Sequence, residues 1–420
     1  MQTHAKNARE KLLKRMDNHS VALLFAGKPP HKSLDQYYDY MPQRNFFYLT
    51  NLSEPNMILM LLKGDKTSKE FLFIEENTDH KIKWEGASME KDEAAKRSLI
   101  DEGSIYTLGQ FDGMFNQMMN YARSILGQPA KTLYLDLYHP SLSAKPMSLV
   151  QAKTIIENYP ELNVKSLNEH LAYLRMFKSD AELKQIKKAI GHTKAGLTNI
   201  LKSLKHRNYE YQLQADFLHA ITLSGSEGNA FDTIAASGQN ATILHYTKNQ
   251  GALNKDDLIL FDLGALHENY ASDISRTYPL SGTYKGRQKE IYEAVLEVNK
   301  ATIEMVKPGV TWKALNAFSK NMLATKAKAL KLIDDEKDIM SVYYHSIGHF
   351  MGLDVHDVGL YDMPLEAGMV VTIEPGLYVK DENIGVRIED DILVTENGYE
   401  NLSKDIPKET KDIEKILKGS

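Results

Sequence analysis

The first 170 residues alternate between short apolar runs and segments with helical periodicity. Strand-like runs stand at 20–27, 71–76 and 132–137. Across 40–61 the pattern predicts an aromatic-rich strand, a polar turn and an apolar strand. Helical periodicity is found at 6–16, 90–102 and 109–125. Strands that alternate with helices indicate an α/β first half.

The pattern changes near residue 175, where a long amphipathic helix begins. Ser179 and Glu182 form the sequence of a capping box at its start. We therefore predict two domains, 1–175 and 176–420. Further helices are predicted in the second domain at 209–223, 286–307 and 311–330, and in the charged tail after Asn401.

Two predicted hairpins in the second domain each bring a pair of carboxylates together. Segments 258–265 and 270–280 read as strands, and a turn between His267 and Glu268 would place Asp262 opposite Asp273. Segments 368–379 and 383–394 form the other hairpin. A tip at 381–382 places Glu374 opposite Glu389.

Such pairs are unfavourable without a counter-charge, since like charges directly across an antiparallel pair destabilise it. One pair among apolar residues could be an accident or could share a proton. Two pairs, close in sequence to a histidine cluster, are better explained by bound cations. Taken singly, Asp262 could be a turn residue, Glu374 the polar end of a strand, and Glu389 part of a solvated acidic run.

The histidine cluster is the segment 345–357, HSIGHFMGLDVHD. It holds three of the 14 histidines of the chain, and Gly348 and Gly352 argue against a regular helix. Each of His345 and His349 alone would more often be a core or surface histidine. The coincidence of suitable ligands on short strands favours a metal site to which this segment contributes histidine.

The composition of the chain limits which partners and which metal ligands we expect. The chain has 420 residues, a net charge of −5 and no cysteine. The charge gives no reason to expect nucleic acid or a membrane surface as partner. Without cysteine, any metal must be held by His, Asp and Glu. The charged amino terminus is unlike a signal peptide, and the longest conspicuous apolar run, 57–62, is too short to span a bilayer, so we expect a cytoplasmic protein.

Four motifs in the second half resemble those of the pita-bread metallopeptidases. They are FDLGALHENYASDISRT, HSIGHFMGLDVHDVG, TIEPGLY and GVRIEDD, in that order. In the first half, QRNFFYLTNLSEPNMILML resembles the amino-terminal domain of aminopeptidase P, so the resemblance spans nearly the full length. It implies an α/β domain followed by a pita-bread catalytic domain, in an enzyme that removes an N-terminal residue preceding proline.

By this resemblance, the family's five metal ligands fall on Asp262, Asp273, His349, Glu374 and Glu389. Asp273 and Glu389 would bridge two metals, and Glu374 would also act as general base and acid. The accessory residues fall on His245, His345, His356 and Arg387. His356 and His245 would donate hydrogen bonds to the substrate carbonyl, and His345 and Arg387, with His356, would bind the peptide.

The resemblance leaves several choices open. Two divalent ions are expected, Mn²⁺ first, with Co²⁺, Zn²⁺ or Fe²⁺ as alternatives. Proline-containing peptides are the expected partners, and related enzymes suggest a homodimer or homotetramer. The closest alternative is a dipeptidase for Xaa-Pro dipeptides. A creatinase-like hydrolase and a non-catalytic peptide-binding scaffold are more remote, because all five ligand positions are filled.

Overall fold

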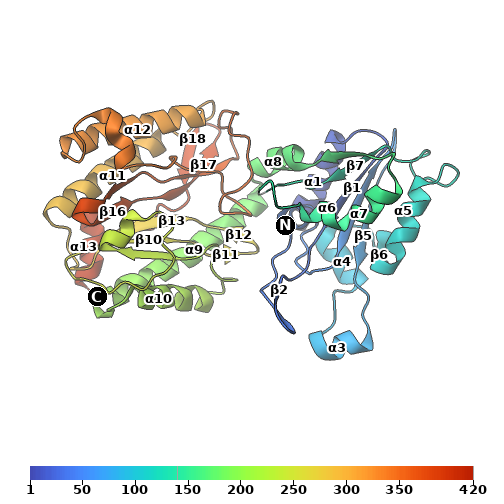
Figure 1. Ribbon diagram of the computed structural model, residues 1–420, viewed down its shortest axis with the longest axis horizontal. Coiled ribbons are helices and arrows are strands. Elements are labelled where there is room, and N and C mark those ends of the chain that lie inside the picture. The colour runs from blue at the N-terminus through green and yellow to red at the C-terminus, as the bar shows by residue number, and fades with distance from the viewer. Residues whose placement is uncertain (140, 420) are drawn as a thin grey trace. The chain divides into compact units, whose positions relative to one another are not determined.

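The computed structural model describes residues 1–139 and 141–419 and divides into two compact units, Met1–Leu174 and Arg175–Ser420 (Figure 1). The first unit contains the strands β1 (Ser20–Phe25), β2 (His31–Ser33), β3 (Gln36–Tyr37), β4 (Ile58–Lys63), β5 (Ser68–Ile74), β6 (Ile105–Thr107), β7 (Thr132–Leu135) and β8 (Asn163–Ser166). Its helices are α1 (Gln2–Arg15), α2 (Arg44–Thr50), α3 (Asp79–Glu85), α4 (Lys91–Ser98), α5 (Phe111–Met119), α6 (Met147–Gln151), α7 (Lys153–Asn158) and α8 (Asn168–Met176), the last of which runs two residues past the division.

A six-stranded mixed sheet organises the first unit, with strands in the order β6-β5-β4-β1-β7-β8. β1, β7 and β8 run parallel, whereas β4 is antiparallel to both of its neighbours. Phe111 and Phe115 of α5 belong to the same buried core as Val21 and Leu23 of β1, and the Phe111 ring contacts Phe73 of β5 with centroids 5.1 Å apart. α1 and α2 contact the central strands β4 and β1. The expected α/β first half is confirmed.

The aromatic segment after Tyr40 corrects the prediction, because it forms helix α2 and not a strand. Every residue from Phe46 to Thr50 is buried, and polar residues are partly exposed only in its first two positions, so the remaining five show no helical alternation of polar and apolar positions. A fully buried helix of one or two turns and a fully buried strand give the same apolar run, and periodicity cannot separate them. The helix ends at Asn51, whose φ of 60° stops it.

The second unit contains the helices α9 (Asp180–Ser203), α10 (Glu210–Leu223), α11 (Gly286–Glu304), α12 (Trp312–Ala329) and α13 (Thr410–Lys418). Its strands are β9 (Ile234–Ser237), β10 (Leu258–Leu263), β11 (Leu266–His267), β12 (Tyr270–Ala271), β13 (Ile274–Pro279), β14 (Val370–Ile373), β15 (Gly376–Val379), β16 (Ile384–Arg387), β17 (Asp390–Thr395) and β18 (Gly398–Asn401). The capping box at Ser179 and Glu182 is present and begins α9 as predicted.

Short antiparallel sheets form the centre of the second unit, in the orders β13-β10-β9 and β14-β17-β18, and the pair β15-β16 lies between β14 and β17 in the chain. In Figure 1 helices α11 and α12 lie on one side of these strands, and α9 and α10 lie on the other. Trp312, Phe350 and Ile373 belong to the core that α11 and α12 cover. Among the residues that the structure describes, no helix is long and apolar enough to cross a membrane.

The pairing register of the first hairpin differs from the prediction. Asp262 stands opposite Ser275, and the turn lies at Glu268 and Asn269, whose φ angles are 49° and 65°. Positive φ at both central residues is the geometry of a tight hairpin turn, and it shifts the tip by one residue. Moving the tip by one whole residue changes each partner by two positions, so each side chain keeps its face.

The register predicted for the second hairpin is confirmed on both sides of the glutamates. Ile373 pairs with Asp390, and Gly376 pairs with Arg387. The ladder is interrupted between these two pairs, and Glu374 and Glu389 lie within the interruption. Asp273 likewise lies between β12 and β13 and not within one continuous strand.

Candidate metal centre

A cavity of about 460 Å³ in the second unit collects all of the predicted site residues. It is lined by the nine predicted residues, His245, Asp262, Asp273, His345, His349, His356, Glu374, Arg387 and Glu389, together with Leu244, Trp312, Asn316, Ser346, Gly348 and Tyr361. The predicted ligands come from both hairpins and from the histidine segment. Folding therefore brings together residues that stand far apart in the sequence.

The four predicted carboxylate ligands and His349 converge on this cavity. Carboxylate oxygens of Asp262, Asp273 and Glu389 lie within 4.8 Å of one another, and His349, Glu374 and Glu389 form a second such group. The Nε2 atom of His349 is 3.4 Å from Asp273 Oδ2 and 3.7 Å from Glu374 Oε1. Glu389 belongs to both groups, so two cation positions would share this carboxylate.

Burial and mutual repulsion make these acids hard to ionise. Burial, with the charges of Glu389 and Asp262, raises the pKa of Asp273 well above its ordinary value. Burial and Glu389 do the same to the pKa of Glu374. Burial and the Asp262 carboxylate raise the pKa of Glu389 to about 7. A set of acids that raise one another's pKa is stabilised in its charged form by a cation.

The donor set fits such a cation. Asp262 Oδ1, Asp273 Oδ1 and Glu389 Oε1 are buried side-chain oxygens without a hydrogen-bond partner among the described residues. A buried acceptor without a partner is unfavourable, and oxygen ligands with one imidazole suit divalent metals such as manganese or zinc. Asp391, which the sequence reasoning did not single out, has a similar unpaired buried Oδ1, and its Oδ2 accepts a hydrogen bond from the Asp273 amide.

His349 is oriented for coordination by its own backbone surroundings. Its Nδ1 lies 3.0 Å from the carbonyl oxygen of Phe350, so Nδ1 carries the proton and Nε2 faces the carboxylates with a free lone pair. Its amide donates to Thr372 Oγ1. The first hydrogen bond fixes the tautomer and the ring direction, and the second holds the backbone that carries the ring.

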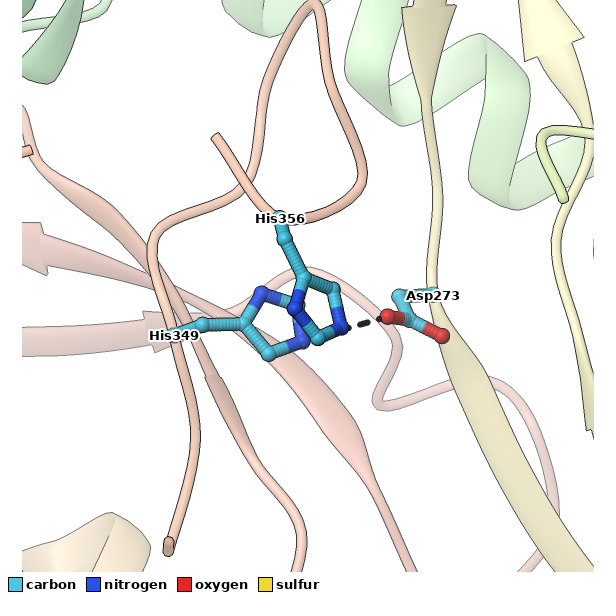
Figure 2. A group of neighbouring side chains, drawn as sticks. All are labelled: Asp273, His349 and His356. Atoms are coloured by element: carbon cyan, nitrogen blue, oxygen red, sulfur yellow. Dashed lines mark ion pairs between the residues drawn. The ribbon is translucent and has the colours of Figure 1, made fainter. Parts of the chain in front are cut away.

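His356 stacks on His349, with ring centroids 3.9 Å apart, and Figure 2 shows both rings directed toward Asp273. A nitrogen of His356 also belongs to a group with Asp273 and His349 whose ligand atoms lie within 4.8 Å of one another. Burial and the neighbouring His349 lower the pKa of His356 to about 4. The imidazole is therefore neutral near pH 7 and can donate one hydrogen bond into the cavity.

Arg387 binds one of the predicted carboxylate ligands directly and reaches a second, Glu389, through a serine. Its Nη2 donates to Asp262 Oδ2 at 2.6 Å, and its Nε donates to Ser275 Oγ at 2.8 Å. Ser275 in turn donates to Glu389 Oε2 at 2.8 Å. β16 ends at Arg387 and Glu389 lies beyond it, so the alternation of a continuous strand does not apply. Arg387 thus holds one carboxylate itself and a second through a serine.

His345 is held by Tyr378, a residue that the sequence reasoning missed. Its Nδ1 is 2.8 Å from the Ser346 carbonyl oxygen and its Nε2 is 2.8 Å from Tyr378 Oη, which also accepts a hydrogen bond from Arg387. Burial and the Arg387 charge lower the pKa of His345 to about 3. A neutral ring is consistent with Nδ1 donating and Nε2 accepting. His245 lies on an exposed turn at the cavity.

Trp312 and Tyr361 line the same cavity and were also missed. Their rings contact each other and Phe350, with centroid distances of 5.0 to 5.2 Å. No motif marks them, since Trp312 is the first residue of a helix and Tyr361 lies in a loop. They give the cavity an apolar wall.

Buried ion pairs support the ligand-bearing segments. Asp390, next to Glu389, bonds to Arg276 at 2.8 Å and to Lys408 at 2.6 Å. Burial opposes ionisation of Asp390, but these two cations hold its pKa well below the ordinary range. Asp357, next to His356, pairs with Lys178 at 3.0 Å and with Arg175, and all three side chains are buried.

Comparison with known proteins gives matches along the chain. Residues 184–396 match metallopeptidase family M24, and residues 4–126 match the N-terminal domain of aminopeptidase P. The Xaa-Pro aminopeptidase of Haemophilus influenzae is 31% identical over 97% of this chain and 96% of that protein. The mitochondrial intermediate cleaving peptidase 55 of Arabidopsis thaliana is 31% identical over 97% of this chain and 81% of that protein. The zinc-substituted aminopeptidase P of Escherichia coli, solved with its product, superimposes with a TM-score of 0.90 at 27% identity, covering 100% of this chain and 98% of that one.

Proposed function

Since the chain belongs to metallopeptidase family M24 and carries the N-terminal domain of aminopeptidase P, we propose that it is a metalloaminopeptidase that hydrolyses the bond between an N-terminal residue and a following proline. The expected fold, an α/β domain followed by a pita-bread catalytic domain, is the one it shares with aminopeptidase P structures. Within this proposal, residues 176–420 form the catalytic domain and 1–175 the aminopeptidase P-type domain. The observation that carries it is the convergence of His349 and four carboxylates, with unpaired buried oxygens, on one cavity.

In the proposed centre, Asp262, Asp273 and Glu389 would hold one cation, and His349, Glu374 and Glu389, with Asp273 shared, would hold the other. This division follows the two groups of mutually close ligand atoms, and the short His349–Asp273 approach supports the bridge. Two divalent cations bound there would lower the pKa of a water molecule and polarise the scissile carbonyl. Arg387 and Ser275 keep Asp262 and Glu389 in place.

Glu374 is the proposed general base and acid. It lines the cavity, its Oε2 lies 3.8 Å from His345 Nδ1, and burial with the Glu389 charge raises its pKa well above the ordinary value, which favours uptake of a proton. It would accept a proton from the attacking water and pass it to the proline nitrogen. A carboxylate whose pKa lies above its ordinary value holds a transferred proton more readily, which suits it to both steps.

His356 and His245 are the proposed hydrogen-bond donors to the substrate carbonyl. Both line the cavity, and the lowered pKa of His356 keeps its ring neutral, so it donates without adding a positive charge beside the metals. His345, His356 and Arg387 are the proposed peptide-binding residues. Trp312 and Tyr361 add apolar surface on which a proline ring could pack.

The finer assignments are part of the same proposal. Manganese is the proposed resident metal, since one imidazole with several carboxylates suits it, although the same set also accepts zinc, cobalt or iron. We also propose a cytoplasmic protein that acts on proline-containing peptides as a homodimer or homotetramer. Metal analysis of protein purified without chelators identifies the resident metal, and the mass of the protein in solution gives the oligomeric state.

Peptide cleavage tests the activity itself. The purified chain, loaded with Mn²⁺, is incubated with Ala-Pro-Ala, Ala-Ala-Ala and Ala-Pro, and the products are separated by mass. Release of alanine from Ala-Pro-Ala alone is expected, and a chelator should stop it. Cleavage of Ala-Pro alone would instead indicate a dipeptidase. Glu374→Gln should be inactive, whereas Glu366→Gln, at an exposed position, should match the wild type.

A further inference from the structure

The interrupted ladder of the second hairpin leaves backbone groups beside both glutamates without their usual strand partners. Regular pairing stops at Ile373 and resumes at Gly376. Within the gap, the amide of Ile388 donates to the Pro375 carbonyl at 3.3 Å. The carbonyl oxygens of Ile373 and Ile388, each directly before a glutamate, accept hydrogen bonds from a group outside these two strands.

That partner is Asn299, a residue of helix α11 that is fully buried. Its Nδ2 lies 3.2 Å from the Ile373 carbonyl oxygen and 3.1 Å from the Ile388 carbonyl oxygen. A side-chain amide has two N–H donors, so one group can satisfy both carbonyls at once. One side chain thereby joins the two strands where their own hydrogen bonds are missing.

The same two peptide units are held on their other edges. The amide of Glu374 donates to the Ile347 carbonyl at 2.8 Å, and the amide of Glu389 donates to the Ser275 carbonyl at 3.1 Å. Each peptide that precedes a glutamate ligand is therefore fixed through both its C=O and its N–H. Asn299 is the contact that the two peptides share.

Lys408 determines which way the Asn299 amide points. Its Nζ donates to Asn299 Oδ1 at 2.7 Å and to Asp390 Oδ2 at 2.6 Å. A flipped amide would turn its N–H groups toward the ammonium and its oxygen toward two carbonyl oxygens, which is repulsive. The donors of Asn299 are thus committed to Ile373 and Ile388.

We propose that Asn299 is a positioning residue for the metal centre, which sets the separation of Glu374 and Glu389 by tying together the peptides that carry them. This inference rests on the proposed dinuclear centre. A metal site tolerates only small displacements of its ligands, about 0.5 Å. Without the amide, two buried carbonyls lose their donors and two repelling carboxylates lose a link between their strands.

Two substitutions of similar size test the proposal. Asn299→Leu removes donors and acceptor, and Asn299→Asp keeps an acceptor for Lys408 but offers no N–H groups. Val298→Ala is the matched control, because Val298 is a buried neighbour on the same helix that makes no such contact. Folding is checked by circular dichroism and thermal melting, and Mn²⁺ is titrated into each metal-free protein by calorimetry. The magnetic coupling of the two ions is followed by electron paramagnetic resonance.

Both Asn299 variants should bind at least one Mn²⁺ equivalent about tenfold or more weakly and show altered coupling, as for other groups that orient metal ligands. Activity toward Ala-Pro-Ala should recover in part at high Mn²⁺, with KM changed less than kcat. Val298→Ala should keep wild-type metal affinity even where its melting temperature falls.

Wild-type affinity and coupling in either folded Asn299 variant would overturn the positioning role. Equal loss of affinity in Val298→Ala, or failure of both Asn299 variants to fold, would assign Asn299 to general stability and overturn it as well. A wild-type protein that binds no Mn²⁺ pair would contradict the proposed centre itself, which is a different result.

Discussion

Removal of metal should make the stability of the second unit fall as pH rises through neutrality. The acids of the centre drive this effect, and Glu389 gives its size. Its pKa rises from an ordinary 4.5 to about 7 in the folded, metal-free protein. At 1.36 kcal/mol per pKa unit, this one group accounts for about 3 kcal/mol. The side chain is buried, so solvent screening reduces the figure little.

The sign follows from counting protons in the folded and unfolded states. Between pH 4.5 and about 7 the folded protein keeps a proton on Glu389 that the unfolded chain has already released. Because the folded state binds more protons, the free energy of unfolding decreases as pH rises. Asp273 and Glu374, whose pKa values are also raised, act in the same direction. Bound cations should remove the dependence by favouring the charged carboxylates.

Urea unfolding between pH 5 and pH 8, in chelator and in excess Mn²⁺, measures the effect. The chain has 2 tryptophans, so Trp84→Phe leaves buried Trp312 as a fluorescent reporter of the second unit. Glu389→Gln should flatten the pH dependence of the metal-free protein, whereas Glu297→Gln, on the exposed side of α11, should not. Equal stability of the metal-free protein at pH 5 and pH 8, or an unchanged slope in Glu389→Gln, would refute the reasoning.

Three further predictions follow from the contacts described for the histidines of the cavity and for the buried ion pairs beside it. His349→Ala should weaken metal binding by about 100-fold or more, whereas His356→Ala should keep the metal and lower kcat by about 10²–10³, as metal analysis beside peptide cleavage would show. Lys178→Met should reduce the free energy of unfolding in urea by about 3 kcal/mol, because it leaves the buried Asp357 with one cation; a loss below 1 kcal/mol would contradict this. Stability should also fall below about pH 4, where the unfolded chain takes up protons that folded Asp390 resists, and urea unfolding of Asp390→Asn should show a smaller loss of unfolding free energy in acid than the wild type.

The sequence predicts correctly those structural features that depend on residues close together in the chain. The capping box at Ser179 and the register of the second hairpin could be predicted because a cap and a tight hairpin depend on neighbouring residues. The tip of the first hairpin was misplaced by one residue, since Glu268 and Asn269 are both able to adopt positive φ and His267 gave no contrary signal. Helix α2 was missed because the burial of its last five residues removes the period that separates helix from strand.

Residues that orient the ligands were harder to find than the ligands. Ser275, Tyr378 and Asn299 each contact a ligand, its backbone or its positioning residue, but no spacing in the sequence connects them to it. Their partners lie on other elements, and only the fold brings them into contact. Asp262 and Glu389, in contrast, stand out as acids within apolar strand patterns.

The interruptions of the strands explain why the carboxylates can converge at all. Within an unbroken ladder, Glu374 and Glu389 would face each other in fixed positions, and their repulsion would destabilise the sheet. Because pairing stops beside them, the amides of both glutamates and the carbonyls before them bond to Ile347, Ser275 and Asn299 instead. The carboxylates can then turn toward the cavity while every one of these backbone groups stays satisfied. The metal centre therefore depends on the points where the strands depart from regular pairing, and these are the points that strand periodicity cannot predict.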